Sequence, residues 1–325
     1  IAGTPTVLSP SSAYTITGTN SGGSDTTTVT IAIDDVVPSI SYSPNSFTLP
    51  VNNLMSPTAI PSNIGGTVPS TIVDGVTVGL YSSLALDSNG YSHVSYYDTI
   101  NKDLKYATDK SGSWVYSTLD STDDVGGCDD NQCSSSSLAI DSNDNIHIAY
   151  SDITNSNLEY MTYDGSSWST PISLDSTDNV GKQLSLAIDY SDNLHVAYYD
   201  LTNGNLEYVT YDGSSWSTPV SLVTTDNVGQ YPSIAVDLSD NLHISYVDST
   251  HGHLEYITFN GVTWSSPNEI YTPGAPKYPS LKVDSNNIVH IAFTETGGGN
   301  QLKYFHSPSW SVISLGASNA GVFPS

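Results

Sequence analysis

The chain has 325 residues and a formal net charge of −26, from 33 acidic residues against 7 lysines and no arginine. Such an acidic surface repels nucleic acid and anionic membranes, whereas cations and neutral polyols remain as partners. No stretch approaches the roughly 20 apolar residues of a membrane-spanning helix, so membrane insertion is not expected. The length allows a large core in more than one domain.

The first 65 residues differ in kind from the rest of the chain. Residues 13–24 and 26–33 alternate apolar side chains with threonine and serine, which is typical of strands. Residues 1–37, with Thr4-Pro-Thr6, 13–24 (Ala-Tyr-Thr-Ile-Thr-Gly-Thr-Asn-Ser-Gly-Gly-Ser) and 26–33, resemble the second half of a bacterial or archaeal Ig-like surface repeat, and 38–66 resemble the opening half of the next one. The resemblance implies a strand-rich Ig-like segment over 1–65, of the kind that serves as a spacer in secreted or cell-surface proteins.

Residues 66–325 contain five copies of one unit with a period near 48 residues. In the third copy, four short runs rich in Tyr, Val, Ile and Thr (185–189, 194–200, 206–211 and 216–222) are separated by Asn, Asp, Gly and Ser. An Asp, a His and a Trp recur in each copy: Asp87, Asp141, Asp189, Asp237 and Asp284; His93, His147, His195, His243 and His290; Trp114, Trp168, Trp216, Trp264 and Trp310. Tandem units of this kind predict an all-β fold, a β-propeller of four-stranded antiparallel blades.

The order of strands within a blade can also be predicted. Ser185 and Ala187 are small, which suits the crowded strand nearest the central axis, and Pro219 places the fourth run at the outer edge. Residues 318–325 match 226–233, which lead into the next copy. Either five blades close by themselves or this chain is a piece of a larger propeller, and the match favours the second.

The two cysteines, Cys128 and Cys133, lie in an insertion that lengthens the first repeat interval to 54 residues. We expect them to form a short disulfide loop, which indicates an exported protein. Thiols that bind a metal are the alternative, although two Cys without nearby His make a poor zinc site.

Residues 162–168 (Thr-Tyr-Asp-Gly-Ser-Ser-Trp) lie between the third and fourth runs. They resemble the Asp-box hairpin of sialidase-like and lectin-type propellers, but lack one residue between Asp and Gly. The resemblance implies a structural turn without catalysis, so Asp164 and Asp212 are expected to cap turns. An arginine-triad sialidase is excluded, because only a guanidinium supplies the bidentate grip on a substrate carboxylate.

The recurring His invites a metal or catalytic interpretation, but one His per blade is more simply a blade-packing group. Calcium is an open alternative at the oxygen-rich turn that carries Asp141 and Asp144, which needs no ion if its side chains bond their own backbone. Asp248 with His251 and His253 is a second candidate metal site, because imidazole and carboxylate are metal ligands. No other cofactor is predicted.

A better candidate for binding is the face on which the inter-blade loops meet the hairpins between second and third strands. Tyrosine rings can stack on a pyranose while carboxylates accept its hydroxyls. The candidate ligand-binding residues are Tyr97, Asp98, Asp152, Tyr199, Asp200, Tyr231, Asp248 and Glu295. Asp123, Asp178, Asp226 and Tyr278 are expected on the same face, which could also be no more than a solvated acidic rim.

These observations predict an extracellular or cell-surface recognition module that binds a glycan or surface polysaccharide. Near-identical blades favour binding, because several weak equivalent sites give avidity. A secreted glycoside hydrolase or polysaccharide lyase that uses Asp or Glu on the same face is the first alternative, since two carboxylates suffice for glycoside hydrolysis. A structural spacer is the second. Catalytic residues and the oligomeric state are left unassigned.

Overall fold

The computed structural model describes residues 9–20, 23–33, 40–41, 62–63, 78–126, 136–272, 274–297 and 299–315. Contacts divide the chain into two compact units, Ile1–Ile72 and Val73–Ser325, and each is described by itself. Every regular element in the described ranges is a strand, and these ranges hold no helix long and apolar enough to cross a membrane.

The first unit contains two antiparallel strand pairs. Strand β1 (Ser9–Asn20) pairs with β2 (Gly23–Ile33), with Asn20 opposite Gly23. The short strands β3 (Ile40–Ser41) and β4 (Ser62–Asn63) pair in the same way. The Ig-like resemblance of this segment stays a prediction.

The second unit consists of five four-stranded antiparallel sheets, each a meander in chain order, which we call blades 1 to 5. Blade 1 is β5 (Val78–Leu86), β6 (Ser92–Asp98), β7 (Asp103–Thr108) and β8 (Val115–Asp120). Blade 2 is β9 (Ser136–Ile140), β10 (Ile146–Asp152), β11 (Asn157–Tyr163) and β12 (Ile172–Asp175). Blade 3 is β13 (Val180–Ile188), β14 (Leu194–Asp200), β15 (Asn205–Tyr211) and β16 (Val220–Val223). Blade 4 is β17 (Gln230–Val236), β18 (Leu242–Asp248), β19 (His253–Phe259) and β20 (Asn268–Tyr271). Blade 5 is β21 (Pro276–Val283), β22 (Val289–Glu295), β23 (Gln301–His306) and β24 (Ile313–Ser314).

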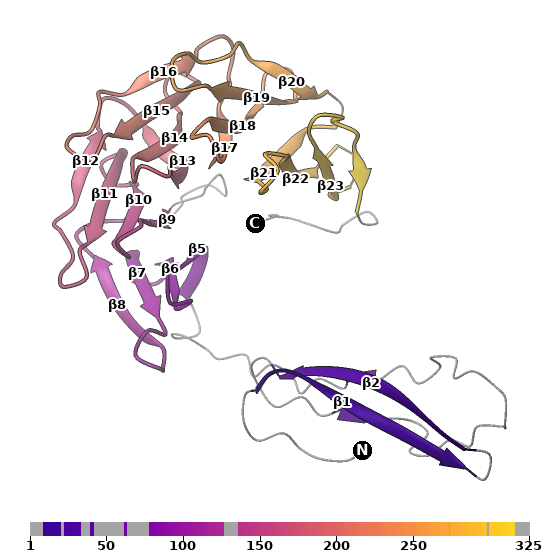
Figure 1. Ribbon diagram of the computed structural model, residues 1–325. Coiled ribbons are helices and arrows are strands. Elements are labelled where there is room, and N and C mark those ends of the chain that lie inside the picture. Colours follow the sequence, from indigo (N-terminus) through magenta and orange to yellow (C-terminus); the bar gives the residue numbers. More distant parts are fainter. Residues whose placement is uncertain are drawn as a thin grey trace. The chain divides into compact units, whose positions relative to one another are not determined.

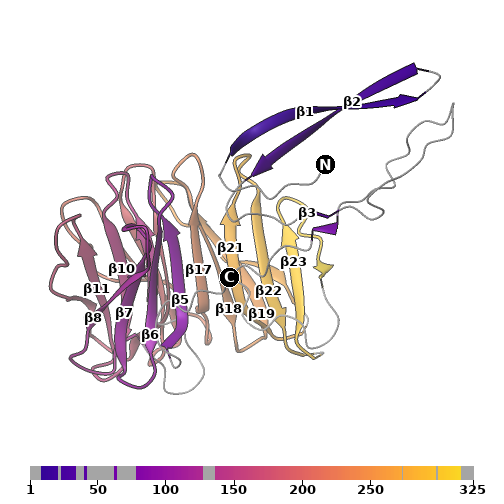
Figure 2. The ribbon, with the colours of Figure 1, turned by 90° about the horizontal axis from the view of Figure 1, so that it is seen from below.

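The blades stand side by side around a common centre, with the first strand of each innermost and the fourth outermost (Figure 1). Seen from the side, the strands of neighbouring blades lie roughly along one common axis (Figure 2). The predicted β-propeller and the strand order within its blades are therefore confirmed.

Four apolar cores lie between successive blades and explain why both faces of the inner strands carry bulky residues. Between blades 2 and 3, for example, Leu186 and Val196 pack in one cluster with Ala149 and Tyr160. Serine hydroxyls link the inner strands, as the N–H of Leu186 donates to Oγ of Ser137 at 3.0 Å. The other three blade pairs repeat this bond, at Leu138 to Ser83, Ile234 to Ser185 and Leu281 to Ser233.

One apolar face in blade 1 differs from its counterparts. Leu84 occupies the position of Leu186 but is 63% exposed, whereas Leu186 is 7% exposed. The difference arises because each blade covers this face of the next one, and in the described residues no blade lies against this face of blade 1. Leucines at the same position of the repeat thus differ in burial between blades 1 and 3.

Candidate functional site

The anchor Asp, the anchor His and a tyrosine of the third strand lie in contact within each blade, with a His–Tyr hydrogen bond in every blade and a His–Asp hydrogen bond in blade 3. In blade 3, Nε2 of His195 lies 3.3 Å from Oδ2 of Asp189, and Nδ1 lies 2.6 Å from the Tyr208 hydroxyl. The other blades repeat these contacts at 3.4–3.5 Å and 2.5–2.7 Å. Burial raises the pKa of Tyr208 to about 12, so its hydroxyl keeps its proton.

The same tyrosines meet the anchor tryptophans of the next blade. The Tyr160 ring lies 4.8 Å from the Trp216 ring, centroid to centroid, in an edge-to-face arrangement. Three further pairs repeat this contact: Tyr106 with Trp168, Tyr208 with Trp264, and Tyr256 with Trp310. The Tyr–Trp contacts therefore join neighbouring blades, and each anchor His holds the tyrosine of its own blade in place, which confirms that the histidines serve packing.

Acid is expected to destabilise the protein through these histidines. Burial lowers the pKa of His195 below the value of about 6.5 that it has in the unfolded chain. The unfolded chain therefore binds more protons than the folded one as the pH falls below that value, and the free energy of unfolding decreases. His147 and His243, whose pKa values are also lowered by burial, act in the same direction.

Urea unfolding of the wild type and of His195→Gln at pH 8 and at pH 5.5 checks this expectation. The variant should be less stable at pH 8, and its deficit should shrink at pH 5.5. Burial raises the pKa of Glu207, so this group makes the folded protein more stable as the pH falls and opposes the effect of the histidines. Comparing the variant with the wild type isolates the histidine, because Glu207 is present in both. A deficit that stays constant or grows towards pH 5.5 would contradict the prediction.

The turns that resemble the Asp-box are capped by their own aspartates. Oδ1 of Asp164 accepts the backbone N–H groups of Ser166 and Ser167 at 2.9 and 2.8 Å, and Asp212 repeats this pattern. The Ser214 hydroxyl and these backbone N–H groups lower the pKa of Asp212 to about 2, and the backbone N–H groups with the Ser166 hydroxyl lower that of Asp164 to about 2. The predicted capping role is confirmed, while the family resemblance stays a prediction.

The oxygen-rich turns considered for calcium use their carboxylates within the fold. Oδ1 of Asp141 accepts the N–H groups of Asn143 and Asn145. Asp144 instead faces blade 1, where it accepts the N–H and the hydroxyl of Ser88 at 2.8 and 2.7 Å. The two carboxylates serve different donors, and the metal-ligand cluster found in the described residues does not include them.

The aspartates that end the second strands lie where the predicted binding face was expected, but they are buried. In blade 3, Oδ1 of Asp200 accepts the N–H groups of Thr202 and Asn203, and Oδ2 accepts the Asn203 side-chain amide at 2.6 Å. Asp98 and Asp152 cap their hairpins in the same way. These buried carboxylates therefore stabilise the hairpins through hydrogen bonds within each hairpin.

The exposed polar groups next to these buried aspartates are a second aspartate and an asparagine, which come from two different loops. The Asn203 amide also lies 3.0 Å from Oδ2 of Asp178, in the loop between blades 2 and 3. One blade earlier, the Asn155 amide lies 3.1 Å from Oδ2 of Asp123. From the sequence these asparagines are predicted as turn residues only, although their recurrence at the same hairpin position indicates a shared role.

Two of the predicted tyrosines are buried and hold the inter-blade loops. The Tyr97 hydroxyl donates to Asp124 at 2.9 Å, and the Tyr199 hydroxyl donates to Oδ1 of Asn227 at 2.6 Å. The loops and hairpins are also joined through their backbones, as the N–H of Leu201 donates to the carbonyl of Asn179 at 2.9 Å. The face is therefore built by bonds between its loops.

The remaining predicted residues lie apart from the Asp–Asn pairs. Tyr231 belongs to the inner strand of blade 4, with its ring 4.6 Å from that of Tyr278 and its N–H donating to Oε1 of Gln183. Glu295 ends the second strand of blade 5 and forms an ion pair with Lys303 at 2.9 Å. Cys128, Cys133 and residues 318–325 lie outside the described residues.

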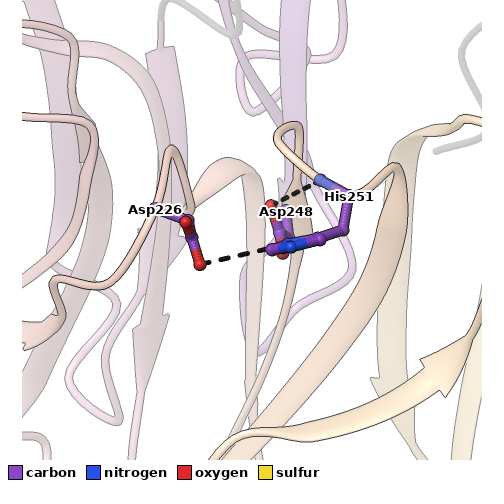
Figure 3. A group of neighbouring side chains, drawn as sticks. All are labelled: Asp226, Asp248 and His251. Atoms are coloured by element: carbon purple, nitrogen blue, oxygen red, sulfur yellow. Dashed lines mark hydrogen bonds and ion pairs between the residues drawn. The ribbon is translucent and has the colours of Figure 1, made fainter.

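Blade 4 departs from the Asp–Asn pattern, because His251 replaces the asparagine (Figure 3). Its Nδ1 lies 2.7 Å from Oδ2 of Asp248 and 3.9 Å from Oδ2 of Asp226. The hydrogen bond to Asp248 raises the pKa of His251. His253, which we predicted with this group, bonds Glu269 at 3.1 Å instead. Three ligand atoms, one each from Asp226, Asp248 and His251, lie within 4.8 Å of one another.

No protein-family model and no curated protein matches the chain. Several solved structures share its fold. A polysaccharide lyase of family PL25, an ulvan lyase, is 17% identical with a TM-score of 0.52, over 75% of this chain and 70% of that one. The SapL1 lectin in complex with alpha methyl fucoside is 15% identical with a TM-score of 0.52, over 97% of this chain and 98% of that one. A protein of unknown function from Dyadobacter fermentans is 11% identical with a TM-score of 0.53, over 76% and 84%.

Proposed function

We propose that the protein is a carbohydrate-recognition module that binds a glycan through the exposed Asp–Asn pairs of blades 2 and 3. The observation that carries the proposal is the recurrence of one arrangement in successive blades. In each, an exposed carboxylate (Asp123 or Asp178) lies beside an exposed amide (Asn155 or Asn203) from the neighbouring hairpin.

The chemistry of these pairs suits sugar hydroxyls. Both N–H groups of Asn203 already point at carboxylates, one at Asp178 and one at Asp200, so its side-chain carbonyl is left to accept hydrogen bonds. The Asp178 carboxylate accepts one bond from Asn203 and keeps further lone pairs for neighbouring hydroxyls. Leu201, exposed on the same hairpin, offers an apolar patch to the C–H face of a pyranose. In this proposal Tyr97, Tyr199 and the buried Asp98, Asp152 and Asp200 position the loops.

The comparisons lend the proposal general support. The similar ulvan lyase has been solved bound to a disaccharide repeat of glucuronate and sulfated rhamnose, and the similar SapL1 lectin bound to a fucoside. A net charge of −26 without arginine favours a neutral glycan over a sulfated or uronic one, because like charges repel. A place outside the cell, or on its surface, belongs to the same proposal.

The double variant Asp123→Asn/Asp178→Asn tests this function on a glycan array. Each exchange keeps the size of the side chain but removes a charged acceptor, which weakens a site about 10-fold or more. Because equivalent sites act together through avidity, we expect array binding by the full chain to fall below detection.

The chain offers a matched control on the opposite face, Asp144→Asn/Asp192→Asn. It removes the same charge, and blade 5 already carries Asn287 at this position, where its Oδ1 accepts the N–H of Leu238. The control should bind glycans as the wild type does. Equal loss in both variants would contradict the proposed sites, and release of product from the bound glycan would point instead to a hydrolase or lyase.

A further inference from the structure

The loop pair at blade 4 holds an imidazole and two carboxylates in a fixed arrangement. Oδ1 of Asp248 accepts the N–H groups of Thr250 and His251 at 2.8 and 3.1 Å, which leaves Oδ2 turned towards the imidazole. The loop that carries Asp226 is tied to this hairpin, because the N–H of Asn227 donates to Oγ1 of Thr250 at 2.9 Å. The Asp248 carboxylate is thus held by its own hairpin, and the loop that carries Asp226 is tied to the same hairpin.

In blades 2, 3 and 4 the residue at this position faces both carboxylates, whether it is asparagine or histidine. Asn203 donates one amide N–H to Asp200 at 2.6 Å and one to Asp178 at 3.0 Å. In blade 4 the same place holds His251, whose single Nδ1 faces both Asp248 and Asp226. The exchange replaces an amide, a weak ligand, by an imidazole, a strong one.

We propose that Asp226, Asp248 and His251 bind a divalent transition-metal cation such as Zn²⁺, with Nδ1 of His251 and one oxygen of each carboxylate as ligands. Imidazole selects such cations over Ca²⁺ and Mg²⁺, which prefer oxygen ligands alone. The cation takes the place of the proton between Nδ1 and Asp248, and the metal-bound imidazole carries its one remaining proton on Nε2. The Asp226 and His251 side chains are 47% and 52% exposed, so the cation has a path to the site and an open position for water or a sugar hydroxyl.

Titration calorimetry of the metal-stripped full chain with ZnCl₂ at pH 8 tests the proposal without any glycan. We expect the wild type to show a saturable site of single stoichiometry. His251→Asn restores the residue of blades 2 and 3, leaves the carboxylates in place, and should lower the Zn²⁺ affinity at least about 10-fold. His253→Asn is the matched control, because this imidazole is bonded to Glu269, and it should bind Zn²⁺ as the wild type does.

The reciprocal variant Asn203→His should add a second site, because Asp178 and Asp200 already face this position. The stoichiometry of Zn²⁺ is then expected to double. The proposal is wrong if the wild type shows no saturable site, or if His251→Asn binds Zn²⁺ as tightly as the wild type. The proposal would also be overturned if His251→Asn and the wild type bound Ca²⁺ and Zn²⁺ with the same affinity, because this would indicate oxygen ligands only.

Discussion

Replacing Gly229 by alanine is expected to lower the free energy of unfolding by roughly 3–5 kcal/mol. Gly229 has a φ of +89°, a backbone conformation that side chains other than glycine rarely adopt. A Cβ atom at this position would also lie 2.6 Å from Cα of Leu206, in the third strand of blade 3. The backbone N of Leu206 would lie 2.7 Å from this Cβ. Neither Leu206 atom can move aside, because both belong to the backbone at the junction of blades 3 and 4. Urea unfolding followed by tryptophan fluorescence measures the loss.

Gly213→Ala separates strain from collision. Gly213 has nearly the same φ of +87°, but a Cβ there meets no atom within 4 Å. We expect this variant to lose only the conformational cost, about 1–2 kcal/mol. If the two variants were equally stable, close approach of the inter-blade loop would have no part in the stability of the propeller.

Leu186→Ala is expected to destabilise the protein by about 2–5 kcal/mol, the usual cost of emptying a well-packed leucine site. Leu186 lies in the core between blades 2 and 3, packed with Leu184, Val196 and Tyr160. The cavity that alanine leaves cannot collapse readily, because sheets fix it on both sides. The same urea unfolding experiment measures this loss.

Leu84→Ala is the matched control for this core position. It makes the same exchange at the same place in the repeat, but Leu84 is 63% exposed. The expected loss is at most about 0.5 kcal/mol, as for ordinary surface substitutions. A loss comparable to that of Leu186→Ala would contradict the description of this face of blade 1 as exposed.

The propeller was predictable because the sequence contains five copies of one four-strand unit. Five copies fix which runs are strands, and a His in every copy indicates packing, as the bond from His195 to Tyr208 confirms. Burial was less predictable. Leu84 and Leu186 stand in equal sequence contexts, and only the position of their blades in the assembly distinguishes them.

The candidate site was predicted in place but not in detail. Asp178 and Asp200 both have Thr and Asn within three residues, so their sequence contexts do not tell which carboxylate faces water. Asp200 is buried because its own hairpin folds over it, whereas Asp178 is exposed. The partnership of Asp178 with Asn203 depends on bonds between two loops 25 residues apart, which a single sequence does not reveal.

Glycan binding by the exposed Asp–Asn pairs is the central claim, and site counting tests it most directly. Titration calorimetry of the full chain with the best glycan from the array should show about two equivalent sites, one for each of the pairs in blades 2 and 3. Both should disappear in Asp123→Asn/Asp178→Asn and persist in Asp144→Asn/Asp192→Asn. Binding that survives the first double variant unchanged, or the absence of any glycan ligand, would contradict the account.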